Sequence, residues 1–367
     1  MFIVFFKGIE KERILKSKID SKAVIRTAGS FVAGAIGSGF ATGQEIMQFF
    51  SAYGVKSIIG SAVTALIFSF CGYSFLTDGY KLAPEEGGEI IEYYIGRIPG
   101  RIFRVLILFL QFSVFVIMIT GAGAIGSEIF GFHSLPGRMI MAALSFGAVI
   151  LGLNRMSRIT GVIGVVVIAS AITAGLFGFL SSSGTISEAD KIAAGADIVK
   201  TDGGWLWSGI LYPALNIVAV SNLGCMLGKK SAGEKEAALS GILGGVLFGA
   251  AVCCVDLGLL ANLSDVYSLD IPSLAVAEKL HPLFRLFFSC MILCGIFSTA
   301  VSALWCFTSR FAKEGTAAFT AVAAAAALSA IFIGQTEFKT LINIVYPIFG
   351  YCGLFLLLGI VIKRLSK

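Results

Sequence analysis

Charged side chains are scarce in this sequence. Aspartate, glutamate, lysine and arginine make up only 14% of the 367 residues, whereas hydrophobic residues make up 57%. A water-soluble protein of this size needs far more polar surface. The composition therefore excludes a soluble globular protein and indicates a polytopic membrane protein. The net charge of +6 needs no nucleic-acid partner to explain it, because positively charged loops are usual in membrane proteins.

Histidine occurs only twice, as His133 and His281 in predicted outer loops. A membrane-embedded enzyme would need a cluster of catalytic histidines, aspartates or serines on facing helices, so we expect no enzymatic activity. The glycine-rich run from Gly37 to Gly43 has neither the spacing nor the preceding strand of a nucleotide-binding loop. The sequence also contains no P-loop motif, which argues against ATP-driven transport by this chain alone.

The cysteines form neither a disulfide framework nor a metal-binding pattern. All eight fall within predicted membrane segments: Cys71, Cys225, Cys253, Cys254, Cys290, Cys294, Cys306 and Cys352. We interpret them as small apolar packing residues.

Long apolar segments recur along the whole chain. Hydrocarbon about 30 Å thick is crossed by roughly 20 helical residues, and ten segments of about this length can be recognised. They lie at about 23–50, 55–78, 101–127, 136–153, 157–180, 206–228, 237–262, 284–309, 315–334 and 340–362. We therefore expect an all-α polytopic membrane protein with ten transmembrane helices.

Positive charge is distributed unevenly between the two sets of loops. If the ten segments alternate in direction, 21 of the 28 lysines and arginines lie on the side that carries both termini. Cytoplasmic loops are enriched in these residues. We therefore expect a multi-pass protein of the cell membrane with both termini in the cytoplasm.

The longest predicted extracellular loop, 181–205, divides the ten segments into five and five. An odd number of segments in each half inverts the second half relative to the first, as in transporters built from inverted repeats. We expect a cytoplasmic arm at 1–21, a first transmembrane repeat at 22–180 and a second repeat at 206–363.

Each half begins with an interrupted apolar segment. The first contains the run Gly34–Glu45, crowded with glycine, serine and threonine, and the sixth contains Pro213 and Asn216 near its middle. Such interruptions free backbone groups, which secondary transporters use to bind ions and substrates. We expect helices 1 and 6 to be discontinuous. A tightly packed helix–helix contact is the alternative for the first segment.

Few side chains in the segments could carry chemistry. Ser298 and Thr299 could join freed carbonyls of the first segment in an all-oxygen cage for Na⁺, or could bond back to their own helix. Carboxylates in membrane segments usually mark a pathway or an ion pair, and Glu45, Glu128 and Asp256 occupy such positions. Glu45 could line an entry vestibule, bind a coupled proton or serve as a structural carboxylate.

The run Gly34–Glu45, followed by Phe49 and Phe50, resembles the first helix of the YkvI-like bacterial membrane proteins. These belong to the amino acid–polyamine–organocation superfamily and are expected to share the LeuT-type fold. By topology the resemblance covers nearly the whole chain, although only the motif in the first segment is specific to the subfamily. It indicates a class of protein and not a substrate.

The resemblance implies positions for an ion and a substrate. In sodium-coupled members of the fold, one Na⁺ lies between carbonyls at the first break and hydroxyls of helix eight. The implied sodium ligands are Ala33, Ile36, Gly295, Ser298 and Thr299, and the implied substrate-binding residues are Gly37, Ser38, Gly39, Phe40, Tyr212, Ala214 and Asn216. Backbone N–H groups at the start of the second half-helix suit an anionic head group such as a carboxylate. Many relatives are coupled to protons instead, so the choice of ion stays open.

Together, these patterns predict a secondary active transporter that moves a small polar metabolite, an amino acid or a related compound, with Na⁺ or H⁺. Alternating access would rock segments one, two, six and seven against segments three, four, eight and nine. A transporter-like ligand sensor, of the kind found in germinant receptors, would keep the same pocket and is the alternative. The sequence does not predict the oligomeric state.

Overall fold

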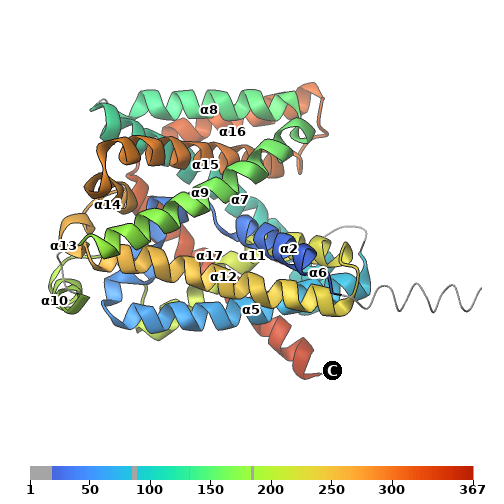
Figure 1. Ribbon diagram of the computed structural model, residues 1–367. Coiled ribbons are helices and arrows are strands. Elements are labelled where there is room, and N and C mark those ends of the chain that lie inside the picture. Colours follow the sequence, from blue (N-terminus) through green and yellow to red (C-terminus); the bar gives the residue numbers. More distant parts are fainter. Residues whose placement is uncertain (1–18, 85–88, 132, 183–185, 367) are drawn as a thin grey trace, which may run out of the picture.

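The structure, a computed structural model, describes residues 19–84, 89–131, 133–182 and 186–366. Within these ranges all regular structure is helical (Figure 1). The helices are α2 (Ser21–Ala35), α3 (Ser38–Thr42), α4 (Gln44–Phe49), the 3-10 helix η1 (Ser51–Tyr53), α5 (Lys56–Leu82), α6 (Glu89–Ile95), α7 (Arg97–Phe130), α8 (Ser134–Leu151), α9 (Leu153–Leu180), α10 (Ile186–Gly195), α11 (Gly204–Lys229), α12 (Glu234–Leu260), α13 (Leu263–Val266), α14 (Pro272–Leu280), α15 (Pro282–Thr308), α16 (Ala317–Ile333) and α17 (Phe338–Leu365).

Seven of the described helices are long and apolar enough to cross a membrane, namely α5, α7, α8, α11, α12, α15 and α17. Two shorter apolar helices lie at Val165–Leu180, within α9, and at Ala317–Ile333. The predicted all-helical membrane architecture is therefore confirmed. Each predicted segment also coincides with one of these helices or, for the first, with α2–α4. The total of ten membrane crossings and the five-plus-five repeat remain predictions.

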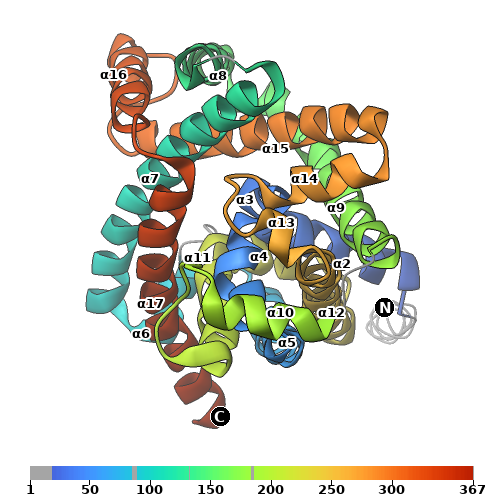
Figure 2. The same cartoon turned by 90° about the vertical axis from the view of Figure 1, so that its left-hand side faces the viewer.

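Helices α5, α8 and α12 run roughly along one axis, whereas α7, α15 and α17 are inclined to it (Figures 1 and 2). Short helices lie at the two ends of this axis (Figure 1). One end carries α6 and the beginning of α2, and we call it the α6 end. The opposite end carries α10, α13 and α14, and we call it the α14 end. Viewed along this axis, α7, α8, α15 and α16 form one group, and α2, α5, α11 and α12 form another (Figure 2). Helix α9 packs against both groups, through α15 and α12, and α17 packs against α11.

The first membrane segment is interrupted twice. Helix α2 ends at Ala35, after which Ile36 (φ −85°, ψ 104°) and Gly37 (φ −91°, ψ −176°) are extended. The short helices α3 and α4 are then separated by Gly43, whose φ of 82° lies in the left-handed region that favours glycine. The predicted discontinuity of the first segment is confirmed.

The sixth segment, in contrast, is one continuous helix, so the predicted break in it is wrong. Helix α11 runs from Gly204 to Lys229 with Pro213 inside it. Proline lacks the N–H that would bond to the carbonyl four residues earlier, here that of Gly209. The hydroxyl of Thr64 on α5 donates to this carbonyl over 2.9 Å. Because a neighbouring helix pairs the freed group, the helix continues through the proline.

A second proline follows the same pattern in α17. Pro347 leaves the carbonyl of Asn343 without its intrahelical donor. The side-chain amide of Gln48 on α4 donates to this carbonyl over 3.2 Å. The contact ties the second half of the broken first segment to α17.

We predict that Thr64→Val destabilises the protein by about 1–3 kcal/mol, because it leaves the buried Gly209 carbonyl without a donor. Thermal or denaturant unfolding of the purified protein in detergent would measure this loss. Thr173→Val is the matched control, since the Thr173 hydroxyl bonds to the Ala169 carbonyl of its own helix. Equal stability of the two variants would contradict the assignment.

Candidate functional site

A cavity of about 870 Å³ lies beside the break in the first segment. Its described walls come from α2, α7, α9, α11, α15 and α17, together with Gly39 of α3 and Glu45 of α4. On α2 the lining begins at Ile25 and Arg26, near the α6 end, and reaches the break at Ile36 and Gly37. The cavity therefore extends from the middle of the membrane segments toward the α6 end. Its size suits a small molecule.

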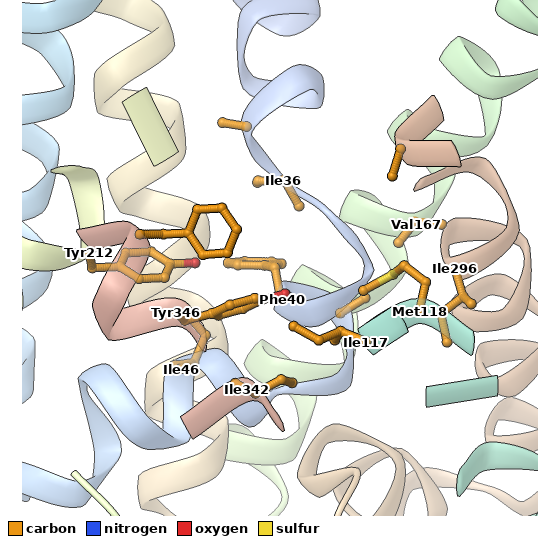
Figure 3. Packing of buried hydrophobic residues seen from close by; sticks show 14 of the residues in the cluster. Ile36, Phe40, Ile46, Ile117, Met118, Val167, Tyr212, Ile296, Ile342 and Tyr346 are labelled. Atoms are coloured by element: carbon orange, nitrogen blue, oxygen red, sulfur yellow. The ribbon is translucent and has the colours of Figure 1, made fainter. Parts of the chain in front are cut away.

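Figure 3 shows the two sides of this region. Tyr212 and Tyr346 lie on one side of the extended segment at Ile36, and Met118 and Ile296 lie on the other. The break thus faces helices of both groups, which is where a bound molecule would contact each of them.

All five residues implied as sodium ligands line this cavity: Ala33, Ile36, Gly295, Ser298 and Thr299. Among the described residues, neither Ser298 nor Thr299 donates its hydroxyl to a carbonyl of α15, whereas Ser302 bonds back to the Ser298 carbonyl over 3.0 Å. The two hydroxyls therefore remain available toward the cavity.

The end of α2 supplies carbonyl oxygens on the opposite wall. The last hydrogen bond of the helix runs from the N–H of Ile36 to the carbonyl of Val32 over 2.9 Å. The turn of the backbone at Ile36 and Gly37 removes the helical donors that would otherwise follow, as at any helix end. Carbonyl and hydroxyl oxygens of this kind are the ligands that a small hard cation prefers, so these residues fit a sodium ion.

Glu45 closes the inner end of the cavity. Only 7% of the residue is exposed, and the Tyr212 hydroxyl donates to its Oε2 over 3.0 Å. Its Oε1 lies over Gly39, so close that a β-carbon on that glycine would be 1.9 Å away. The hydroxyl of Tyr346 lies beside the same glycine, 2.8 Å from the same position. A carboxylate and two tyrosine hydroxyls thus meet at the start of the second half-helix.

Tyr212 is held in place by an aromatic cluster. Its ring centroid lies 5.2 Å from that of Phe49, 5.1 Å from that of Phe50 and 5.8 Å from that of Phe248. The ring is fully buried. This packing fixes the hydroxyl that binds Glu45, so the position of the carboxylate depends on α11 and α12 as well as on α4.

The implied substrate-binding residues fall into two sets. Gly37, Gly39 and Asn216 line the cavity. Phe40, Tyr212 and Ala214 are buried and are not among its described lining residues. Ser38 begins α3, and its side chain lies outside the described residues. The substrate contacts of these residues remain predictions.

Some lining residues were not expected from the sequence. Tyr346 and Phe349 come from α17, and Gln111 and Met118 come from α7. Pro347 was an available signal, since it lies within a membrane segment directly after Tyr346, as Pro213 lies directly after Tyr212. Nothing in the sequence of α7 marks which of its faces lines a cavity.

The cavity carries little charge. Among the described lining residues, only Arg26 and Glu45 are charged, one near the α6 end and the other at the closed inner end. None of the ion pairs that the structure describes includes Glu45. A positively charged ligand or a proton at the inner end would offset the cost of burying this carboxylate.

Comparison with known proteins supports this architecture. No protein-family model matches the chain. The chain is 25% identical to the uncharacterized membrane protein YkvI of Bacillus subtilis over 338 residues, which is 92% of the chain and 95% of YkvI. It is also 26% identical to the uncharacterized protein YyaD of the same organism, over 88% of the chain and 91% of that protein.

Solved structures match over most of the chain. A Na⁺-coupled sialic acid symporter in its substrate-bound outward-open state matches with a TM-score of 0.58 and 16% identity, over 99% of the chain and 87% of the symporter. The inward-facing conformation of Mhp1 matches with a TM-score of 0.55 and 12% identity, over 90% of the chain and 75% of Mhp1. A variant of the manganese transporter of Eremococcus coleocola matches with a TM-score of 0.55 and 13% identity, over 94% of the chain and 78% of that transporter.

The chain is similar to YkvI over nearly its whole length, and its fold is of the LeuT type. The resemblance inferred from the first segment is therefore confirmed. The solved neighbours are membrane transporters and not enzymes. A manganese transporter, a sialic acid symporter and Mhp1 share one fold, so the fold alone selects neither substrate nor ion.

We predict that Gly39→Ala destabilises the protein by about 1–3 kcal/mol, because the added methyl group would overlap the Glu45 carboxylate. Gly29→Ala is the matched control, since Gly29 also lines the cavity but has open space around it. That change should stabilise the helix by up to about 1 kcal/mol. Thermal unfolding of both variants would measure the difference, and equal losses would contradict the contact between Gly39 and Glu45.

Proposed function

We propose that this protein is a secondary active transporter that moves a small polar metabolite, an amino acid or a related compound, by symport with Na⁺ or H⁺. The observation that carries the proposal is the cavity at the broken first segment, which brings free carbonyls, hydroxyls and one buried carboxylate together. An amino acid suits these surroundings, since its ammonium group can pair with Glu45 while its carboxylate meets backbone N–H groups of α3.

The coupling ion has two candidate positions. Na⁺ would be held by the carbonyls of Ala33, Ile36 and Gly295 and by the hydroxyls of Ser298 and Thr299, all at the cavity wall. A proton would be held by Glu45, whose burial favours the neutral form unless a cation is near. Both positions adjoin the break, so either ion would organise the backbone that contacts the substrate.

The proposed transport cycle alternates access to this cavity. If both termini lie in the cytoplasm, as we propose, the α6 end faces inward and the cavity extends toward the cytoplasm. The two proposed repeats, 22–180 and 206–363, each place a short helix between their second and third long helices, α6 in the first and α14 in the second. This correspondence favours the inverted five-plus-five repeat, with α2, α5, α11 and α12 rocking against α7, α8, α15 and α16.

We predict that an amino acid raises the Tm of the purified protein, because a ligand that binds only the folded state stabilises it by mass action. The screen would test the amino acids with NaCl and with choline chloride at equal ionic strength. If Na⁺ is the coupling ion, the shift requires sodium and is lost in Thr299→Ala. If H⁺ is the coupling ion, the shift is independent of sodium and is lost in Glu45→Gln.

Thr320→Ala is the matched control for Thr299→Ala, since Thr320 is exposed on α16 and should leave every shift unchanged. A Tm that no amino acid changes under any condition would reject the proposed substrate class. A ligand that binds but does not accumulate in proteoliposomes under an ion gradient would favour the sensor over the transporter.

A further inference from the structure

Another buried carboxylate lies outside the described lining of the cavity. Asp256 belongs to α12 and is fully buried. Its Oδ1 accepts a hydrogen bond from the hydroxyl of Ser51 over 2.7 Å, and its Oδ2 accepts one from the hydroxyl of Ser57 over 2.5 Å. Both serines are themselves at most 1% exposed. The cluster therefore has no access to water in this arrangement.

No cationic side chain compensates this carboxylate. None of the ion pairs that the structure describes includes Asp256. The titratable groups near its contacts are Glu45, Tyr53 and Lys56 of the first segment and α5, Cys253 and Cys254 of α12, and Asp190 of α10. Lys56 is exposed at the beginning of α5. An isolated charge in such surroundings costs several kcal/mol, and the two hydroxyl donors offset part of that cost.

A cation on α14 is engaged elsewhere. This helix packs against α12, and its Lys279 is paired with Asp265 and donates to the side chain of Asn262 over 2.9 Å. Lys279 is therefore not placed to pair with Asp256.

We propose that Asp256, Ser51 and Ser57 bind a monovalent cation, either a proton or Na⁺. Carboxylate and hydroxyl oxygens are hard donors that suit both ions. If Asp256 is protonated, its carboxyl O–H would donate a hydrogen bond to one of the two serine hydroxyls. The oxygen–oxygen distances of 2.7 and 2.5 Å suit hydrogen bonds that involve a carboxyl group. A sodium ion would instead be coordinated by the serine hydroxyl oxygens, whose hydrogens can rotate away from the ion.

The position of the site gives the cation a definite role. Ser51 begins η1, directly after α4, Ser57 lies in the first turn of α5, and Asp256 lies near the end of α12. The occupant would fasten the far end of the broken first segment to the two helices that pack most extensively against each other. Glu45 and Asp256 would then hold α4 from opposite ends, one inside the cavity and one outside it.

The test measures thermal unfolding of the full-length protein without any substrate. One arm raises the pH at constant ionic strength, and the other replaces choline chloride by NaCl at constant pH. A proton held only by the folded state makes the Tm of the wild type fall as the pH rises, whereas a bound sodium ion makes it rise with NaCl. In Asp256→Asn, which keeps a neutral oxygen for the serines, the corresponding response should be lost.

Control variants separate this site from the cavity. Thr299→Ala and Glu45→Gln remove the two ion positions of the proposed transport site, so a response that survives in both and disappears in Asp256→Asn belongs to Asp256. Asp78→Asn is the matched control, because Asp78 is a buried carboxylate that is paired with Arg364 over 3.2 Å. That variant should lose stability and keep the cation response.

If Asp256→Asn does not fold, Ser57→Ala tests the proposed cation site, because this variant keeps the carboxylate. It should shift the midpoint of the response about two- to tenfold in ion concentration, the equivalent of one hydrogen bond. An unchanged midpoint would overturn the proposed site. A wild type that responds to neither ion, or an Asp256→Asn variant that responds as the wild type does, would overturn it as well. Each result is independent of whether an amino acid binds in the cavity.

Discussion

A backbone N–H or carbonyl inside a bilayer needs a partner, because the hydrocarbon offers none. The central part of this protein is organised around that requirement. At Pro213 and Pro347 the freed carbonyls are paired by side chains of neighbouring helices, Thr64 and Gln48, and both helices continue. At the end of α2 none of the described side chains pairs with the freed carbonyls, and the backbone becomes extended at Ile36 and Gly37. The freed carbonyls there face the cavity, where an ion or a substrate can act as the partner.

Close approach between helices depends on small residues. The β-carbon of an alanine at Gly241 would lie 2.3 Å from the carbonyl carbon of Gly72, so α5 and α12 pack backbone against backbone at this point. Farther along the same pair of helices, the rings of Phe68 and Phe248 stack with centroids 4.2 Å apart. Small residues are a common means of bringing membrane helices together where lipid provides no hydrophobic drive. Such packing makes α5 and α12 suited to move as one body.

Helix α4 is unusual because polar groups hold it at both ends and along its side. Glu45 is bound by Tyr212 near its beginning, Gln48 is bound to α17, and Ser51 just beyond its end is bound to Asp256. Each contact joins the broken first segment to a different helix. A change of protonation or of ion occupancy at either carboxylate would therefore alter the same short element, which lies next to the proposed substrate position.

The sequence by itself determined the membrane class, the approximate limits of the apolar helices and an interruption within the run Gly34–Glu45, because each of these follows from local composition or backbone chemistry. The structure placed that interruption at Ile36 and Gly37. The sequence also supplied the five implied sodium ligands, which the fold brings to one cavity. The tertiary structure alone decided that α11 continues through Pro213, since the donor that makes this possible lies on α5. Only the tertiary structure showed that Tyr346 lies beside Glu45 and that Ser51 and Ser57 donate hydrogen bonds to Asp256. Whether a proline breaks a helix, and whether a buried carboxylate is paired, depends on partners that are distant in the chain, and local sequence carries no record of them.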